Sequence, residues 1–265
     1  MSYTNNHRAL LQVIMEREAV STADARELIV KLFQQNESTQ TYIHQINVKL
    51  EPLNMTIKLV TCELTGHKYW ILISTLIDKT ASFQNEFSPA QLELLRKILS
   101  EIITSDDGCA PSTACLNLCS SLDTQMSKAD AEDFLAKMVE KKWFVKEHGK
   151  FYMGVRSIAE LIPYFKASYS EEALKTCALC RQMVFHGERC ICCHNVLHML
   201  CFANCARVQN PPKCPSCNTI MSTDNINDFD AYNDHMLDFP EMSVETENSE
   251  KRTTNPTKKR KYSAR

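Results

Sequence analysis

Nine of the chain's 13 cysteines lie between Cys177 and Cys217, and this cluster constrains the fold more than any other feature. Four ligand pairs, each with two residues between its members, follow one another along this segment. They are Cys177 and Cys180, Cys190 and Cys193, His198 and Cys201, and Cys214 and Cys217. Thiolate and imidazole groups suit zinc, which takes four such ligands in a tetrahedron. Eight ligands therefore predict two zinc ions.

Disulfide bonds are the main alternative use of clustered cysteines, and they belong to secreted chains. The first ten residues, MSYTNNHRAL, contain no apolar signal segment behind a basic start. No apolar run approaches the roughly 20 residues that cross a membrane. We therefore expect a reducing compartment, metal binding by the thiols and no association with membranes.

The ligand order, four cysteines, one histidine and three cysteines, is shared by PHD fingers and variant RING domains. Both are cross-braced, so that the first and third pairs hold one ion and the second and fourth pairs hold the other. An apolar residue inside the first pair and a proline inside the last pair are typical of RING domains, and Leu179 and Pro215 match them. PHD fingers usually carry an aromatic residue where this chain has Pro212. These details favour a RING-like domain over a PHD-like one.

Some cysteines and histidines lie outside the regular pairs. Cys192 directly precedes Cys193 and could replace it as a ligand, although only Cys193 preserves the two-residue spacing. We expect Cys205 to pack as a small apolar side chain and His186 and His194 to lie at the surface. The remaining cysteines, Cys62, Cys109, Cys115 and Cys119, lack paired spacing, so core packing is expected for them. No residue stands out as catalytic.

The first third of the chain alternates between helical and strand periodicity. Apolar residues recur at helical spacing in three segments, 10–14, 25–33 and 42–50. The period then changes to two over residues 55–61, and a turn at Gly66 leads back into residues 69–74. Three helices followed by a β-hairpin predict a winged helix, which we place at residues 1–87.

The same order repeats in the next segment. A capping box at Ser88 starts a helix that runs until Gly108, a short helix is expected over 111–118, and Ser127 caps a third. Two short apolar runs around a turn at Gly149 then form a wing. We therefore expect a second winged helix at residues 88–170, with one amphipathic helix over 157–169 at its end.

These expectations combine into a mainly α fold with small β wings: tandem winged helices followed by a cross-braced two-zinc RING-like domain. The RING-like domain is placed at residues 171–221. Residues 222–265 lose aliphatic periodicity and turn from acidic to basic, which predicts a disordered tail. Its KKRK run at 258–261 fits a nuclear-import signal or a solvated basic end.

Charge bears on whether the winged helices bind DNA. The chain carries a net charge of −2, and the third helix of the second unit mixes lysines with carboxylates. Entry into a DNA groove needs an excess of basic side chains to displace counterions from the phosphates. Protein docking is therefore favoured over DNA binding, which we expect to be weak at most.

Tandem winged helices followed by this ligand pattern resemble the non-SMC element 1 family, a subunit of the SMC five/six complex. The resemblance covers roughly residues 5–221 and is strongest from Cys177-Ala-Leu-Cys180 to Cys214-Pro-Ser-Cys217. It implies a nuclear, chromosome-associated subunit that acts in DNA repair and recombination. The implied partners are a MAGE-type subunit, non-SMC element 3, and a kleisin, non-SMC element 4.

The activity that the resemblance implies is RING-type ubiquitin ligation, in which a conjugating enzyme is held so that its thioester faces a lysine. Leu179 and Pro215 would contact that enzyme. Efficient RING ligases often carry Arg or Lys directly after the last zinc ligand, where this chain has Asn218. Weak ligation without the MAGE partner is therefore expected. A scaffold subunit with a purely structural zinc domain is the main alternative, and a PHD-like histone reader is another.

Overall fold

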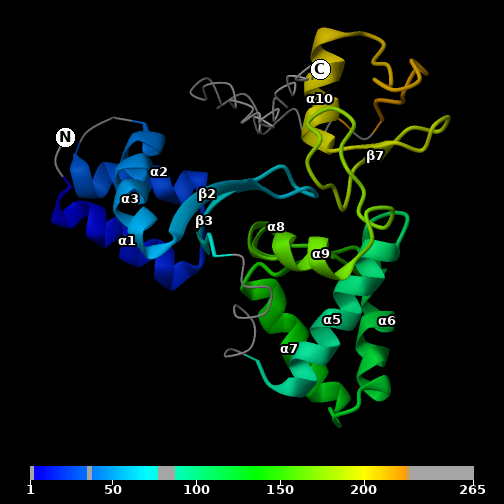
Figure 1. Ribbon diagram of the computed structural model, residues 1–265, viewed down its shortest axis with the longest axis horizontal. Coiled ribbons are helices and arrows are strands. Elements are labelled where there is room, and N and C mark those ends of the chain that lie inside the picture. The colour runs from blue at the N-terminus through cyan, green and yellow to red at the C-terminus, as the bar shows by residue number, and fades with distance from the viewer. Residues whose placement is uncertain (1–2, 35–37, 77–86, 225, 227–265) are drawn as a thin grey trace, which may run out of the picture. The chain divides into compact units, whose positions relative to one another are not determined.

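The computed structural model of the chain describes residues 3–34, 38–76, 87–224 and 226 (Figure 1). Within them, two helical units each carry a three-stranded antiparallel sheet, with strand orders β1-β3-β2 and β4-β6-β5. The middle strand in each sheet is the last along the chain. This shared order confirms the predicted α+β fold of tandem winged helices.

The described residues of the first winged helix form three α-helices and three strands. Its elements are α1 (Asn5–Arg17), β1 (Ala19–Ser21), α2 (Thr22–Phe33), α3 (Thr39–Leu50), a 3-10 turn (Glu51–Leu53), β2 (Met55–Thr61) and β3 (Lys68–Ser74). Ser21 caps α2 by accepting a hydrogen bond from Asp24 N. Leu10, Ile14 and Ile46 are fully buried, so the helical spacing read from the sequence marks the core.

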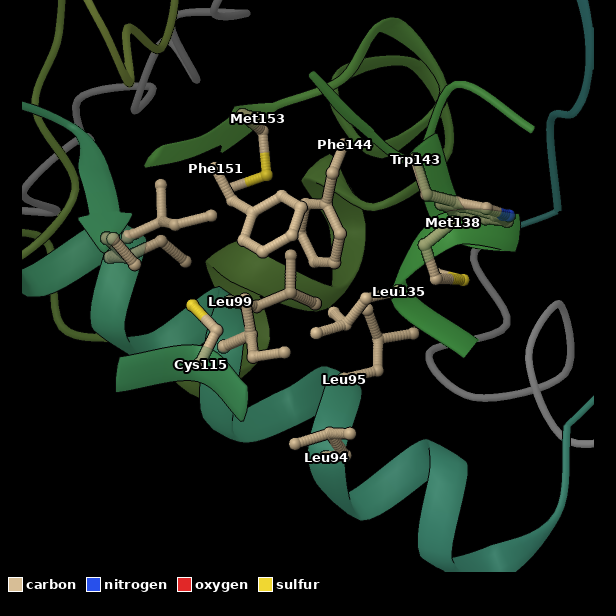
Figure 2. Close-up of a cluster of buried hydrophobic side chains, with 14 of the residues drawn as sticks. Leu94, Leu95, Leu99, Cys115, Leu135, Met138, Trp143, Phe144, Phe151 and Met153 are labelled. Atoms are coloured by element: carbon tan, nitrogen blue, oxygen red, sulfur yellow. The ribbon is translucent and has the colours of Figure 1, made fainter. Parts of the chain in front are cut away.

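The second winged helix repeats this order. Its elements are α5 (Pro89–Thr104), β4 (Cys109–Pro111), α6 (Ser112–Asn117), a 3-10 turn (Leu118–Ser121), α7 (Lys128–Glu140), β5 (Phe144–Glu147) and β6 (Lys150–Met153). Both halves of the capping box between Ser88 and Gln91 are formed. The core is drawn in Figure 2, where Leu95 and Leu99 of α5 face Leu135 of α7 and the ring of Phe144.

Two details of this half differ from expectation. Pro111 is the last residue of strand β4 rather than the first of a helix. The amphipathic helix expected over 157–169 is two helices, α8 (Val155–Glu160) and α9 (Ile162–Ser168). The break falls at Leu161 because Pro163 lacks an N–H and suits the first turn of a new helix.

Arg156 ties the two winged helices together. Its side chain is 8 % exposed. The guanidinium lies 2.6 Å from a Glu18 carboxylate oxygen and 2.8 Å from a Glu160 carboxylate oxygen, and it stacks over the Trp143 ring at 4.2 Å. Val155 packs in a small cluster with Cys62 and Ile71 from the first unit. The two carboxylates offset the cost of burying the positive charge of Arg156.

The cysteine-rich segment is small and built around short turns. It contains β7 (Glu188–Arg189), β8 (Val196–Leu197) and α10 (Met199–Val208). Val184, Leu197 and Phe202 form its buried core. Ile226 is also buried in this core, so packing continues beyond the expected boundary at residue 221. Apart from residues 222–224 and 226, the expected tail lies outside the described residues.

One loop of this segment packs into the second winged helix. Phe185 belongs to that unit's core, where its ring lies 5.3 Å from the ring of Phe165. A Cβ added to Gly108 would lie 1.7 Å from the carbonyl oxygen of Phe185, so only glycine allows this approach.

No described helix is long and apolar enough to span a bilayer.

Candidate metal centre

The eight predicted ligands converge in two separate groups. Cys177, Cys180, His198 and Cys201 form the first cluster, and Cys190, Cys193, Cys214 and Cys217 form the second. The ligand atoms of each cluster lie within 4.8 Å of one another. First and third pairs therefore meet, as do second and fourth pairs, which is the cross-braced arrangement. Each cluster could hold one metal ion.

Three of the four pairs are built as the same turn. The N–H of the residue after the second cysteine donates to the carbonyl oxygen of the first, at 2.8 Å for Arg181 and 2.9 Å for His194 and Asn218. Those three residues adopt the left-handed conformation, with φ between 59° and 61°. The turn brings both sulfurs of a pair to one side. Local backbone geometry thus sets the direction of both side chains of a pair.

The remaining pair uses a helix. His198 occupies the N-cap of α10 and Cys201 lies in its first turn, so the two side chains share a face. His198 Nδ1 lies 3.2 Å from Cys180 Sγ and 3.8 Å from Cys201 Sγ. Nδ1 is therefore the ring nitrogen that faces the first cluster.

Protons are shared unevenly in the first cluster. A hydrogen bond with Cys201 holds the pKa of Cys177 far below its usual value, at about 2, and raises the pKa of Cys201. Burial lowers the pKa of His198, but hydrogen bonds with Cys177 and Glu63 raise it to about 11. Metals bind thiolates and neutral imidazole, so loading this cluster releases protons and becomes more favourable as pH rises.

The second cluster consists of four sulfurs. Cys190 Sγ lies 3.5 Å from Cys217 Sγ, and Cys193 Sγ lies 3.5 Å from Cys214 Sγ. The Thr219 hydroxyl, 3.3 Å from Cys217 Sγ, lowers the pKa of that thiol to about 6. Cys192 is exposed and does not take part in the cluster. The structure thus places Cys193, rather than its neighbour, among the four thiols that could hold the second ion.

The other cysteines occupy varied surroundings. Cys62, Cys109, Cys115 and Cys119 are buried, as expected for core packing. Burial raises the pKa of Cys115 to about 12, so it stays a thiol rather than a nucleophilic thiolate. Cys205 is only half-buried and lies outside the described core clusters.

The two non-ligand histidines differ. His194 is exposed, as expected. His186 is not a free surface residue, because its ring contacts Tyr152 at 5.0 Å and its Nδ1 lies 2.9 Å from Asp107 O. Neither histidine belongs to a ligand cluster, as expected, and of the two only His186 is partly buried.

The predicted contact residues for a conjugating enzyme, Leu179 and Pro215, are both exposed. Leu179 exposes 39 % of its surface. Each lies inside a paired turn, one from each cluster. Pro212 is buried, at the position where PHD fingers usually carry an aromatic residue.

One residue near the first cluster gave no signal in the sequence. Glu63 lies in the turn between β2 and β3 and is 7 % exposed. Its Oε1 is 3.3 Å from His198 Nε2, the ring nitrogen that points away from the thiols. It is far from the cysteine-rich segment in sequence and belongs to no motif, so spacing could not identify it.

Together, the fold and the ligand clusters define a class of protein: tandem winged helices followed by a cross-braced RING-like module with two potential metal sites. A family model described as "Nse1 non-SMC component of SMC5-6 complex" matches residues 7–116 and 107–161. The chain belongs to this family.

Individual relatives extend the similarity into the cysteine-rich segment. The chain is 32 % identical to the bovine "Non-structural maintenance of chromosomes element 1 homolog" and 31 % identical to the human one, covering 81 % of this chain and 83 % of each relative. The chain is 27 % identical to the Schizosaccharomyces pombe "Non-structural maintenance of chromosomes element 1", over 82 % of this chain and 91 % of that protein. A chain from a solved "Nse1-Nse3-Nse4 complex" matches with a TM-score of 0.72 and 28 % identity, over 82 % of this chain and 96 % of that one.

Proposed function

We propose that this protein is a RING-type ubiquitin ligase subunit of the SMC5-6 complex, with one zinc ion in each ligand cluster. The observation that carries the proposal is the cross-braced pair of clusters with Leu179 and Pro215 exposed at the RING-matching positions. Zinc is the metal that best suits three thiolates with one imidazole, and four thiolates. In this proposal the zinc ions hold the fold that exposes Leu179 and Pro215 to the conjugating enzyme. The RING-like domain supplies no nucleophile to the reaction.

The proposed partners are a MAGE-type Nse3 subunit and a kleisin Nse4 subunit, since a similar chain was solved within an Nse1-Nse3-Nse4 complex. The winged helices would supply the docking surface, within the proposed limits 1–87 and 88–170. Mixed charge on α7, with Lys128 and Lys137 alongside Asp133 and Glu140, supports protein docking over strong DNA binding. A nuclear, chromosome-associated role in DNA repair follows from this assignment.

Leu179→Ala is expected to reduce ubiquitin transfer by the complex with Nse3 about 5–30-fold. Leu179 contributes exposed apolar area and is not a metal ligand, and truncating an interface anchor typically costs about 1–2 kcal/mol or more. The measurement is ubiquitin-chain formation with a charged conjugating enzyme, together with zinc content. Ile191→Ala is the matched control, because Ile191 is 82 % exposed inside another ligand pair and does not occupy the RING-matching position.

The same assay separates a ligase from a scaffold whose zinc module is purely structural. Asn218→Arg restores the basic residue that efficient RING ligases carry after their last ligand, and it should raise transfer. Its backbone tolerates the change, because Arg181 adopts φ 59° at the equivalent position where Asn218 adopts 61°. If both variants leave partner-stimulated transfer unchanged, the scaffold function is correct.

A further inference from the structure

The wing of the first winged helix reaches the metal-ligand cluster of the RING-like module through one carboxylate. Glu63 follows Cys62 in the β2–β3 turn, and hydrogen bonds from Cys62 N to His67 O and from Gly66 N to Cys62 O close that turn. Cys62 itself is 2 % exposed and packs with Ile71 and Val155, which anchors the base of the turn. The position of Glu63 is therefore fixed by the packing of the neighbouring Cys62.

Glu63 contacts three residues of the cysteine-rich segment. Its Oε2 accepts hydrogen bonds from Phe185 N at 3.0 Å and His186 N at 2.8 Å. Its Oε1 lies 3.3 Å from His198 Nε2. Met183 O also lies 3.0 Å from this nitrogen. A carboxylate that is 7 % exposed needs such partners, and these three lie within residues 185–198.

The ring of His198 is held from both sides. Nδ1 faces the thiols of Cys180 and Cys201, so an ion in the first cluster would bind that nitrogen and leave Nε2 protonated as a donor. Glu63 and the Met183 carbonyl then lie where acceptors for Nε2–H are needed. A carboxylate on the distal nitrogen of a metal-bound histidine fixes the ring orientation and tautomer and makes the ligand more basic.

We infer that Glu63 is a positioning residue for His198, and that metal binding in the first cluster and docking of the wing on the RING-like module stabilise each other. The inference rests on metal binding by the first cluster and does not depend on ligase activity. Such coupling is reciprocal. If the docked wing raises the metal affinity by some factor, the bound metal raises the equilibrium constant for wing docking by the same factor. Since the second cluster has four sulfurs and no histidine, the effect is confined to one of two ions.

Glu63→Gln is expected to speed zinc release from the first cluster about 10-fold and leave the second unchanged. An amide offers one acceptor and one donor, so it cannot accept from both His198 Nε2–H and the Phe185 and His186 amides. Loss of such an outer partner typically costs 10–100-fold in metal affinity, and the lower value applies because Met183 O remains. Release is followed in the zinc-loaded full chain with a chromophoric chelator.

Cadmium-113 NMR of the cadmium-loaded chain identifies which site responds, because a three-sulfur, one-nitrogen site resonates apart from a four-sulfur site. Glu63→Gln should shift only the former resonance. Glu18→Gln is the matched control, since Glu18 also joins two units by pairing with Arg156 but touches no ligand. Equal acceleration of both ions would show general loosening and overturn the inference, as would no acceleration at all.

A second measurement compares the wild-type chain with and without zinc, and then repeats the comparison in the variant. Hydrogen exchange of residues 55–74 in the wild-type chain should quicken when zinc is removed, and this dependence should shrink in Glu63→Gln. Wing protection that is indifferent to zinc would contradict the reciprocal half of the inference. If the wild-type chain binds only one ion, in a four-sulfur site, the first cluster does not hold a metal. The inference about Glu63 would then fall together with that metal assignment.

Discussion

Cys193→Ala is expected to lower the metal content from two ions per chain to one, whereas Cys192→Ala leaves it at two. Cys193 Sγ lies 3.5 Å from Cys214 Sγ within the second cluster, while Cys192 is exposed outside it. Structural zinc contributes on the order of 10 kcal/mol to folding of small domains, so loss of one of its four ligands removes most of that stabilisation. Metal analysis of chains purified without chelator gives the count.

The adjacent position makes this pair of variants well matched, because each removes one thiol from the same turn. Near-ultraviolet circular dichroism reports whether the remaining cluster keeps its fold. If Cys192→Ala loses the ion and Cys193→Ala retains it, the ligand assignment is wrong. Cys192 would then pair with Cys190, with one residue between the two ligands instead of two.

Gly108→Ala is expected to destabilise the chain by about 2–5 kcal/mol. Gly108 has φ +66°, which costs an L-residue about 1–2 kcal/mol, and its new Cβ would lie 1.7 Å from the Phe185 carbonyl oxygen. Displacing that backbone adds overpacking of about 1–3 kcal/mol. Thermal unfolding of the zinc-loaded chain measures the effect.

Gly149→Ala separates the two contributions. Gly149 has φ +72° in the β5–β6 turn, and nothing lies within 4 Å of its added Cβ. It should cost only the backbone contribution, about 1–2 kcal/mol. Equal losses for both variants would mean that the loop holding Phe185 does not press against the second winged helix in solution.

Local patterns in the sequence were enough to predict most of the fold. The predicted caps of α5 and α7 at Ser88 and Ser127 are both present, because a cap depends on residues within one turn. Strands β1 and β4 were missed. Each has three residues, and they are strands only because β3 and β6 pair with them across the fold.

The candidate site divides in the same way. Paired spacing of the ligands is a local property, and the structure brings together the groups that the spacing suggested. The contact of Glu63 with His198 joins the turn of the first wing to the RING-like module. A lone glutamate beside a glycine turn looks like an ordinary solvated residue, so only the fold reveals its partner.

The loop between the first two ligand pairs constrains how this protein can change. Within it, Met183 O contacts His198, Phe185 fills the core of the second winged helix, and Arg189 donates to Asp106 O at 2.7 Å. Surface loops in general tolerate added residues. Here one inserted residue would shift these contacts out of register together, so lengthening should be accepted elsewhere on the surface before it is accepted between Cys180 and Cys190.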